Sequence, residues 1–138
     1  MAKFSLKGLY AVASMYVLAK KYSENVPVKI KEIASLSNTP QNFLEQILNE
    51  LKKCMLVKSV RGAKGGYMLS KDPSSITVYD ILLCIEGDIF DMECKTKNST
   101  MELFWADFRD SVKKELSIKL SDLKEYEQKA LKQNMFYI

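Results

Sequence analysis

Apolar residues in the first third of the chain recur at helical spacing and predict three helices. Over 5–20 they repeat every three or four residues, with Ser5 placed to cap the first turn. A short helix is predicted over 29–37. The turn at 38–40 then leads into a third helix, with Thr39 as its N-cap and Pro40 in the first helical position. This third helix carries the clearest apolar stripe, made of Phe43, Leu44, Ile47, Leu48 and Leu51.

The opposite face of the third predicted helix is polar. Four side chains at positions i, i+3, i+4 and i+7 share that face: Asn42, Glu45, Gln46 and Asn49. Amides can form two hydrogen bonds to adenine, and a glutamate can accept one from the cytosine amino group. The face therefore suits reading of the DNA major groove, while an ordinary solvated helix surface remains the alternative.

A short β-branched run over 56–60 and a second run over 67–70 predict a hairpin with a basic tip. The tip holds three of the five glycines in the chain, Gly62, Gly65 and Gly66, together with Arg61 and Lys64. Two short helices, a polar-faced helix and a basic hairpin, in that order, predict a winged helix-turn-helix. A plain surface hairpin is the alternative reading of this segment.

The second half of the chain predicts two further helices and a short terminal one over 121–131. Thr77 to Asp80 reads as a capping box opening a helix that ends at Gly87, with Cys84 expected as an inert buried thiol. After a loop over 88–98, the segment from Ser99 to Glu102 is predicted to cap a long helix, with Ser99 as the N-cap, and this helix carries more apolar surface than a terminal helix needs. Its stripe predicts either a two-fold dimer interface or intrachain core, and consists of Met101, Phe104, Trp105, Phe108, Val112 and Leu116.

Composition and charge narrow the function classes. The 138 residues include no histidine, which excludes Ser-His-Asp triads and His-ligated metal sites and makes an enzyme the weakest hypothesis. Residues 1–80 carry 12 Lys or Arg against 6 Asp or Glu, whereas residues 81–138 carry 9 against 11, so the first half could meet a polyanion. Three cysteines without a C-x-x-C pair fit a reducing cytoplasm better than a disulfide framework. We expect no signal peptide and no membrane span.

Several stretches together resemble the Rrf-two-type (Rrf2-type) bacterial transcription regulators. These are SLKGLYAVASM, VKIKEIA, FLEQILNELKK, LVKSVRGAKGGYMLS and ITVYDILLCIEG, closely over 3–87 and more loosely over 99–116. The resemblance implies a mainly α-helical, homodimeric winged-helix protein that binds double-stranded DNA in the bacterial cytoplasm. By position it assigns base contacts to Asn42, Phe43, Glu45 and Gln46, the wing to Arg61, Gly62, Lys64, Gly65 and Gly66, and phosphate contacts to Lys3, Ser5 and Lys7.

The sequence differs from this family in the loop that is expected to act as the sensor. Cluster-binding members place three cysteines in the loop before the dimerisation helix, whereas this loop holds Cys94 alone. Because iron–sulfur clusters need about four ligands, mostly thiolates, a [2Fe-2S] centre is disfavoured and we expect no cofactor or metal. The family's usual small residue and glycine after the third helix are replaced by Cys54 and Met55. A positive φ at Met55 would cost about 1 kcal/mol.

The leading hypothesis is a sequence-specific DNA-binding regulator, a repressor, that lacks the three-cysteine loop. Its signal could be a thiol modification of Cys94, a small effector ligand or a partner protein. Two alternatives stay open: a redox sensor using a cluster or the Cys94 thiol, and a winged-helix module that binds protein. The expected organisation is a DNA-binding domain over 1–87, a sensor-type loop over 88–98, and a dimerisation and terminal helix region over 99–138.

Overall fold

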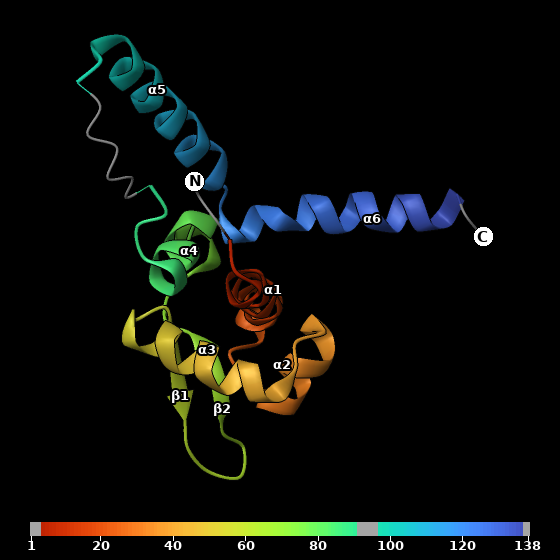
Figure 1. Cartoon of the computed structure of the whole chain (residues 1–138). Helices are drawn as coiled ribbons and strands as arrows, with labels where there is room; N and C mark the ends of the chain where they lie inside the picture. The colour runs from red at the N-terminus through yellow and green to blue at the C-terminus, as the bar shows by residue number, and fades with distance from the viewer. Residues whose placement is uncertain (1–3, 91–96, 137–138) are drawn as a thin grey trace.

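The computed structural model describes residues 4–90 and 97–136, and these form a mainly helical fold with one β-hairpin (Figure 1). Its elements are α1 (Leu6–Lys21), η1 (Tyr22–Glu24), α2 (Ile30–Ser37), α3 (Gln41–Lys53), β1 (Val57–Val60), β2 (Gly66–Leu69), η2 (Pro73–Ser75), α4 (Val78–Glu86), α5 (Ser99–Leu116), η3 (Leu120–Leu123) and α6 (Lys124–Phe136). The predicted fold class is confirmed. Lys3 and Cys94 lie outside the described residues.

Two of the predicted helix starts are confirmed. The Ser5 side chain accepts a hydrogen bond from the Gly8 N–H. Thr77 and Asp80 form the expected capping box, in which each side chain accepts from the backbone N–H of the other residue. Each cap satisfies a backbone donor that the first helical turn leaves without a partner, so these two helices begin where local chemistry places them.

Two other starts differ from the prediction. Helix α3 begins at Gln41 with Pro40 as its N-cap, because the buried Thr39 side chain accepts a hydrogen bond from the Ser37 hydroxyl at 2.9 Å and does not cap the helix. Asn98 caps α5, since its side-chain oxygen accepts from the Met101 N–H at 3.3 Å. In both cases the element exists as predicted and its boundary moves by one residue.

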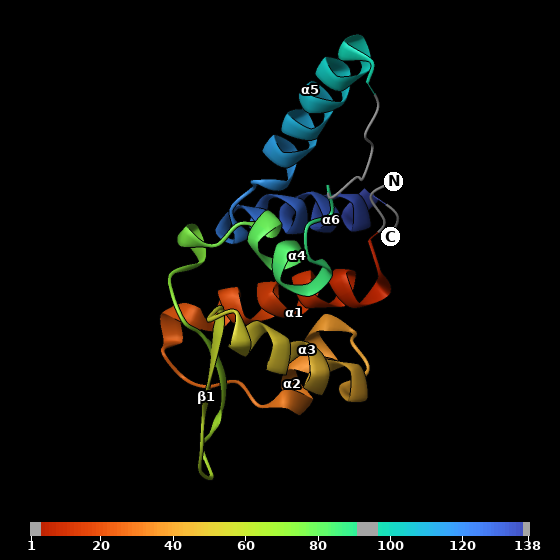
Figure 2. The ribbon, with the colours of Figure 1, turned by 60° about the vertical axis from the view of Figure 1, so that its left-hand side comes forward.

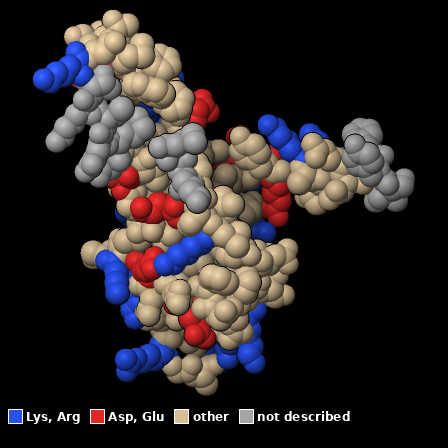
Figure 3. Space-filling view, viewed as in Figure 1, with Lys and Arg blue, Asp and Glu red and all other residues tan. Residues whose placement is uncertain are grey.

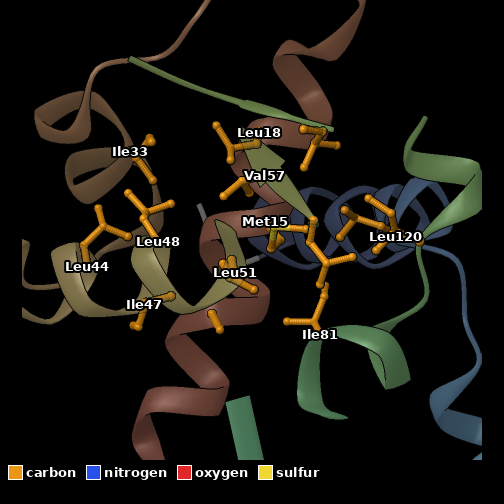
Figure 4. Packing of buried hydrophobic residues seen from close by; sticks show 14 of the residues in the cluster. Met15, Leu18, Ile33, Leu44, Ile47, Leu48, Leu51, Val57, Ile81 and Leu120 are labelled. Carbon is orange, nitrogen blue, oxygen red and sulfur yellow. The ribbon is translucent and has the colours of Figure 1, made fainter. Parts of the chain in front are cut away.

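The core surrounds α1, which packs against α2, α3, α4 and η3 (Figure 4). Helix α3 contributes four fully buried residues of its predicted stripe, Leu44, Ile47, Leu48 and Leu51. The fifth, Phe43, is 41% exposed. Burial of the four aliphatic side chains fixes the rotation of α3 about its axis, and its polar face therefore points away from the core.

The hairpin is antiparallel and is tied back to the helices. Val57 pairs with Leu69 and Val60 with Gly66. Val28, between α1 and α2, bridges Tyr67 through two backbone hydrogen bonds of 2.9 Å. The hairpin is thereby held against the segment that leads into α2.

The chain after α5 returns to the core. Val78 donates its N–H to the Ile118 carbonyl at 3.0 Å, and Leu120 donates to the Ile76 carbonyl at 2.8 Å. The Leu120 side chain is completely buried. Helix α5 extends away from this body in both views, whereas α6 projects to one side in Figure 1 and passes behind α4 in Figure 2. None of the helices in the described ranges has the length and apolar character of a membrane span.

Two cysteines form a disulfide, which corrects two expectations from the sequence. Cys54, at the end of α3, is bonded to Cys84 in α4, with their Cα atoms 6.1 Å apart. The chain therefore holds one disulfide among its described residues, and Cys84 is half-buried and bonded where an inert buried thiol was predicted. Spacing of 30 residues gave no sign of it, because the contact depends on how α3 packs against α4.

Candidate nucleic-acid interface

The polar face of α3 is exposed along its whole length. Asn42, Glu45, Gln46 and Asn49 are all exposed, and the aliphatic residues between them are fully buried. A helix anchored in this way presents amide and carboxylate groups in one row, as insertion into a major groove requires.

Phe43 differs from the other residues assigned to base contacts. Its ring lies 6.0 Å from the Tyr10 ring of α1, centroid to centroid, at an interplanar angle of 49°. The side chain thus packs partly against α1 while 41% of it stays exposed at the edge of the reading face. An apolar group in this position could contact a thymine methyl.

The glycines of the wing are required by its geometry. Gly62 has a φ of +112°, which L side chains rarely adopt. A Cβ on Gly65 would lie 2.9 Å from the Gly62 carbonyl oxygen, and one on Gly66 would lie 2.6 Å from the Val28 carbonyl carbon. These residues let the turn close tightly and leave Arg61 and Lys64 exposed at its tip.

Lysines beside α2 extend the basic surface of the wing, which the sequence did not indicate. Lys29 donates from its ammonium to the Ala63 carbonyl at the wing tip, at 3.0 Å. Lys29 and Lys31 line a hollow of about 430 Å³ together with Gly65, Gly66 and Tyr67. Lysine and arginine side chains gather around this end of the molecule (Figure 3). The exposed basic residues here are Lys29, Lys31, Lys58, Arg61 and Lys64.

Ser5 and Lys7, assigned to phosphate contacts by the resemblance, each have a carboxylate partner. The Ser5 N–H donates to Glu86 at 3.1 Å, and its hydroxyl donates to the same carboxylate. The Lys7 ammonium pairs with Glu50 of α3. Both residues are half-buried, so they connect α1 to α4 and α3 at the edge of the candidate interface.

The first half of α5 exposes the predicted apolar stripe to solvent. Trp105 lies between two rings at near-perpendicular angles, with centroid distances of 5.0 Å to Phe104 and 5.7 Å to Phe108. Leu103, which the stripe did not include, is 71% exposed. Val112 and Leu116, nearer the body of the protein, are half-buried.

An apolar groove of about 580 Å³ runs along α1 beside α4 and η3. It is lined by Phe4, Leu9, Val12, Ala13, Tyr16, Val78, Leu82, Leu116, Leu123, Tyr126 and Glu127. At its edge the Tyr16 hydroxyl donates to Glu127, which also accepts from Lys20 at 3.1 Å. Burial, followed by this bond to a carboxylate, raises the pKa of Tyr16 to about 12. The Tyr16 bond, then that of Lys20, lowers the pKa of Glu127.

The described residues do not supply a ligand set for a metal or an iron–sulfur cluster. No group of three Cys, Asp or Glu residues that could hold an ion occurs in the described ranges. The chain has no histidine, and two of its three cysteines are bonded to each other. The donor chemistry therefore does not fit a cluster, which needs about four mostly thiolate ligands.

Comparison with known proteins identifies matches along nearly the whole chain. The family model Rrf2, described as "Iron-dependent Transcriptional regulator", matches residues 4–126. The transcriptional regulator CymR of Bacillus subtilis is 40% identical over 138 residues, covering 99% of both chains. The regulator IscR of Klebsiella pneumoniae is 37% identical over 95 residues, covering 69% of this chain and 58% of that relative. The solved structure of B. subtilis CymR superposes with a TM-score of 0.83 at 41% identity, covering 91% of this chain and 98% of that one.

Proposed function

Since the chain belongs to the Rrf2 family and is a DNA-binding transcription regulator, we propose that it represses transcription as a homodimer that reads DNA with α3. The observation that carries this proposal is the exposed polar face of α3 beside a basic, glycine-built wing. Two symmetry-related copies would place their α3 helices in successive major grooves, about one helical turn apart. The operator should then be an inverted repeat.

Each part of the surface has a distinct task in this proposal. Asn42 and Gln46 would read adenines through paired hydrogen bonds, and Glu45 would accept from a cytosine amino group. Arg61 and Lys64 would follow a phosphate strand or enter a narrow minor groove. Lys29 would hold the wing tip through Ala63 and add positive charge next to the same strand.

Fluorescence anisotropy with a labelled duplex from the DNA upstream of its own operon tests the proposal. Gln46→Ala should weaken binding to this duplex by about 1–3 kcal/mol and reduce the preference for it over random DNA. Arg61→Ala should flatten the salt dependence of binding by about one unit for each lost phosphate contact. Gln128→Ala, on the exposed surface of α6, is the matched control and should bind as the wild type does. Indifference to both substitutions would refute the proposed reading surface.

The exposed aromatic stripe of α5 supports the dimer. Five large apolar side chains on the first half of this helix remain 36–71% exposed, which is costly for a protein working alone: Met101, Leu103, Phe104, Trp105 and Phe108. The groove along α1 offers an apolar surface of the same chain that no described segment fills. We therefore propose that the α5 stripe of one protomer packs on the partner, against its α5 and its groove.

Light scattering after size-exclusion chromatography measures the assembly directly. The wild type should elute at twice the 15.8 kDa mass of one chain. Phe104→Asp should give the monomer, whereas Asp107→Ala, on the same helix but outside the stripe, should leave the dimer intact. Trp105 is the only tryptophan, so its emission should shift to the red when Phe104→Asp exposes it to water. A wild-type monomer at micromolar concentration would contradict the dimer.

The near-complete match to CymR supports a proposal about the regulated genes. The solved relative is described as the global cysteine regulator of B. subtilis. We propose that this chain likewise represses genes according to cysteine supply and that it acts in the cytoplasm, with the DNA. Expression of a reporter fused to the bound promoter should rise when the gene encoding this protein is deleted. A fall in expression would show that the protein activates transcription instead.

A further inference from the structure

The disulfide between Cys54 and Cys84 lies outside the polar face of α3 that is proposed to read DNA, but Cys54 directly follows the last residue of that helix. Cys54 is the C-cap of α3 and is exposed, whereas Cys84 in α4 is half-buried. The bond closes a loop across a sequence separation of 30, and this loop contains the entire wing. A change at this bond therefore acts at the end of the helix that the proposed function places in the major groove.

The surroundings of Cys84 suit its sulfur both in the disulfide and as a free thiol. Its Sγ lies 3.4 Å from the Glu50 carbonyl oxygen of α3, an acceptor that a reduced S–H could use. Two residues further along α4, Glu86 accepts from the Ser5 N–H and hydroxyl. The Glu50 side chain in turn pairs with Lys7. In the bonded structure, the last turn of α4 therefore also contacts α3 and the start of α1 through interactions other than the disulfide.

We propose that Cys54 and Cys84 are a reversible thiol–disulfide site whose closure strengthens DNA binding, with low-molecular-weight disulfides as the oxidants. A protein that binds DNA inside a bacterial cell works where thiols are generally kept reduced, and disulfides found there are mostly transient or redox-sensing. The inference rests on the proposed reading of DNA by α3. It concerns a pair of cysteines distinct from Cys94.

Closure proceeds by two thiol–disulfide exchanges. The exposed Cys54 loses its proton to solvent, and its thiolate attacks one sulfur of a small disulfide RSSR, giving a mixed disulfide and RS⁻. Cys84 then loses its proton, and its thiolate attacks the Cys54 sulfur and displaces the second RS⁻. The protein gives up two electrons and two protons, and RSSR takes them up as two RSH. Excess RSH reverses both steps.

Closure should favour binding because it fixes the end of α3. The disulfide-bonded structure already has the reading face exposed and the wing in place. The crosslink removes freedom of α3 relative to α4 that the reduced protein would lose on meeting DNA. We expect the bonded form to bind the upstream duplex about fivefold or more tightly than the reduced form, within the usual range of coupling between two sites.

The test uses the full chain carrying Cys94→Ser, so that only the pair remains. Protein reduced and desalted without oxygen is treated with cystine, its free thiols are titrated, and peptide mapping locates the bond. Duplex affinity of both forms is then measured by anisotropy. Both free thiols should disappear into a Cys54–Cys84 linkage, binding should tighten, and added cysteine should reverse both changes. A variant with Cys54→Ser and Cys84→Ser should bind equally in all conditions.

The outcomes separate this inference from the proposed function. Thiols that persist in excess cystine, or linked protein that binds no more tightly than reduced protein, would overturn the inference while leaving DNA reading intact. Protein that binds the duplex in neither form would overturn both. A cystine response that survives in the doubly substituted variant would place the effect elsewhere and also overturn it.

Discussion

Replacing Gly66 with alanine tests whether the wing depends on its contact with the segment before α2. The added methyl carbon would lie 2.6 Å from the Val28 carbonyl carbon and 3.1 Å from the Lys29 nitrogen, both of them backbone atoms. Because backbone cannot rotate away as a side chain can, Val28 and Tyr67 must separate. This separation loses their two mutual hydrogen bonds of 2.9 Å.

The expected magnitude is the difference of two opposing effects. Two backbone hydrogen bonds contribute about 1 kcal/mol each to stability, so their loss costs about 2 kcal/mol. Alanine restricts the unfolded chain more than glycine does, which returns about 0.7 kcal/mol. The net loss is about 1.3 kcal/mol, which corresponds to a decrease in Tm of roughly 5 °C for a protein of this size.

Urea unfolding followed by circular dichroism measures this change, and a thermal scan gives the Tm. Ala63→Ser, at the exposed wing tip, is the control and should stay within about 0.5 kcal/mol of the wild type. The sign of the change in the free energy of unfolding tests the steric argument. Without the steric conflict, the lower entropy of the unfolded chain alone would make Gly66→Ala more stable than the wild type. A stabilised variant would refute the reasoning.

Three further predictions concern single side chains. Met55 has a φ of +62° and is 77% exposed, so Met55→Gly should raise the free energy of unfolding by about 0.5 kcal/mol in urea titrations. Thr77→Ala removes the capping box with Asp80 and should lower the free energy of unfolding by about 1 kcal/mol in the same assay. An unchanged free energy would contradict a stabilising role of the cap. The pKa of Tyr16 is raised from 10.0 to about 12, so the stability it contributes is complete below pH 10 and is lost as pH rises toward 12. Ultraviolet titration should show a late-ionising component that Tyr16→Phe removes, and an unchanged titration curve would refute the assignment.

The features predictable from the sequence were those set by neighbouring residues. The apolar stripe of α3 was correct at four of five positions, because burial follows the 3.6-residue period of a helix. Met55 does have a positive φ, +62°, which is the conformation whose cost of about 1 kcal/mol the sequence analysis stated as a condition. The glycines of the turn and the Thr77 capping box depend on backbone geometry within a few residues, which sequence chemistry describes well.

The features that could not be predicted join distant segments. The bond between Lys29 and Ala63 and that between Ser5 and Glu86 span 34 and 81 residues. The Cys54–Cys84 disulfide depends on the packing of α3 against α4. No local period encodes such distances, so these contacts emerge only once the core has fixed the helix positions. Thr39 fails as a cap although its contact is local, because its side chain is buried and its hydroxyl is bonded to that of Ser37, two residues earlier.

The buried Leu120 limits how this protein can be divided. A fragment that stopped before α5 would leave a cavity where Leu120 fills the core and would lose the backbone bonds at Ile76 and Val78. Losing a buried leucine side chain alone typically costs about 3 kcal/mol. A chimera that exchanged α5 and α6 for another dimerisation module would therefore need to retain 117–123 as part of its DNA-binding half.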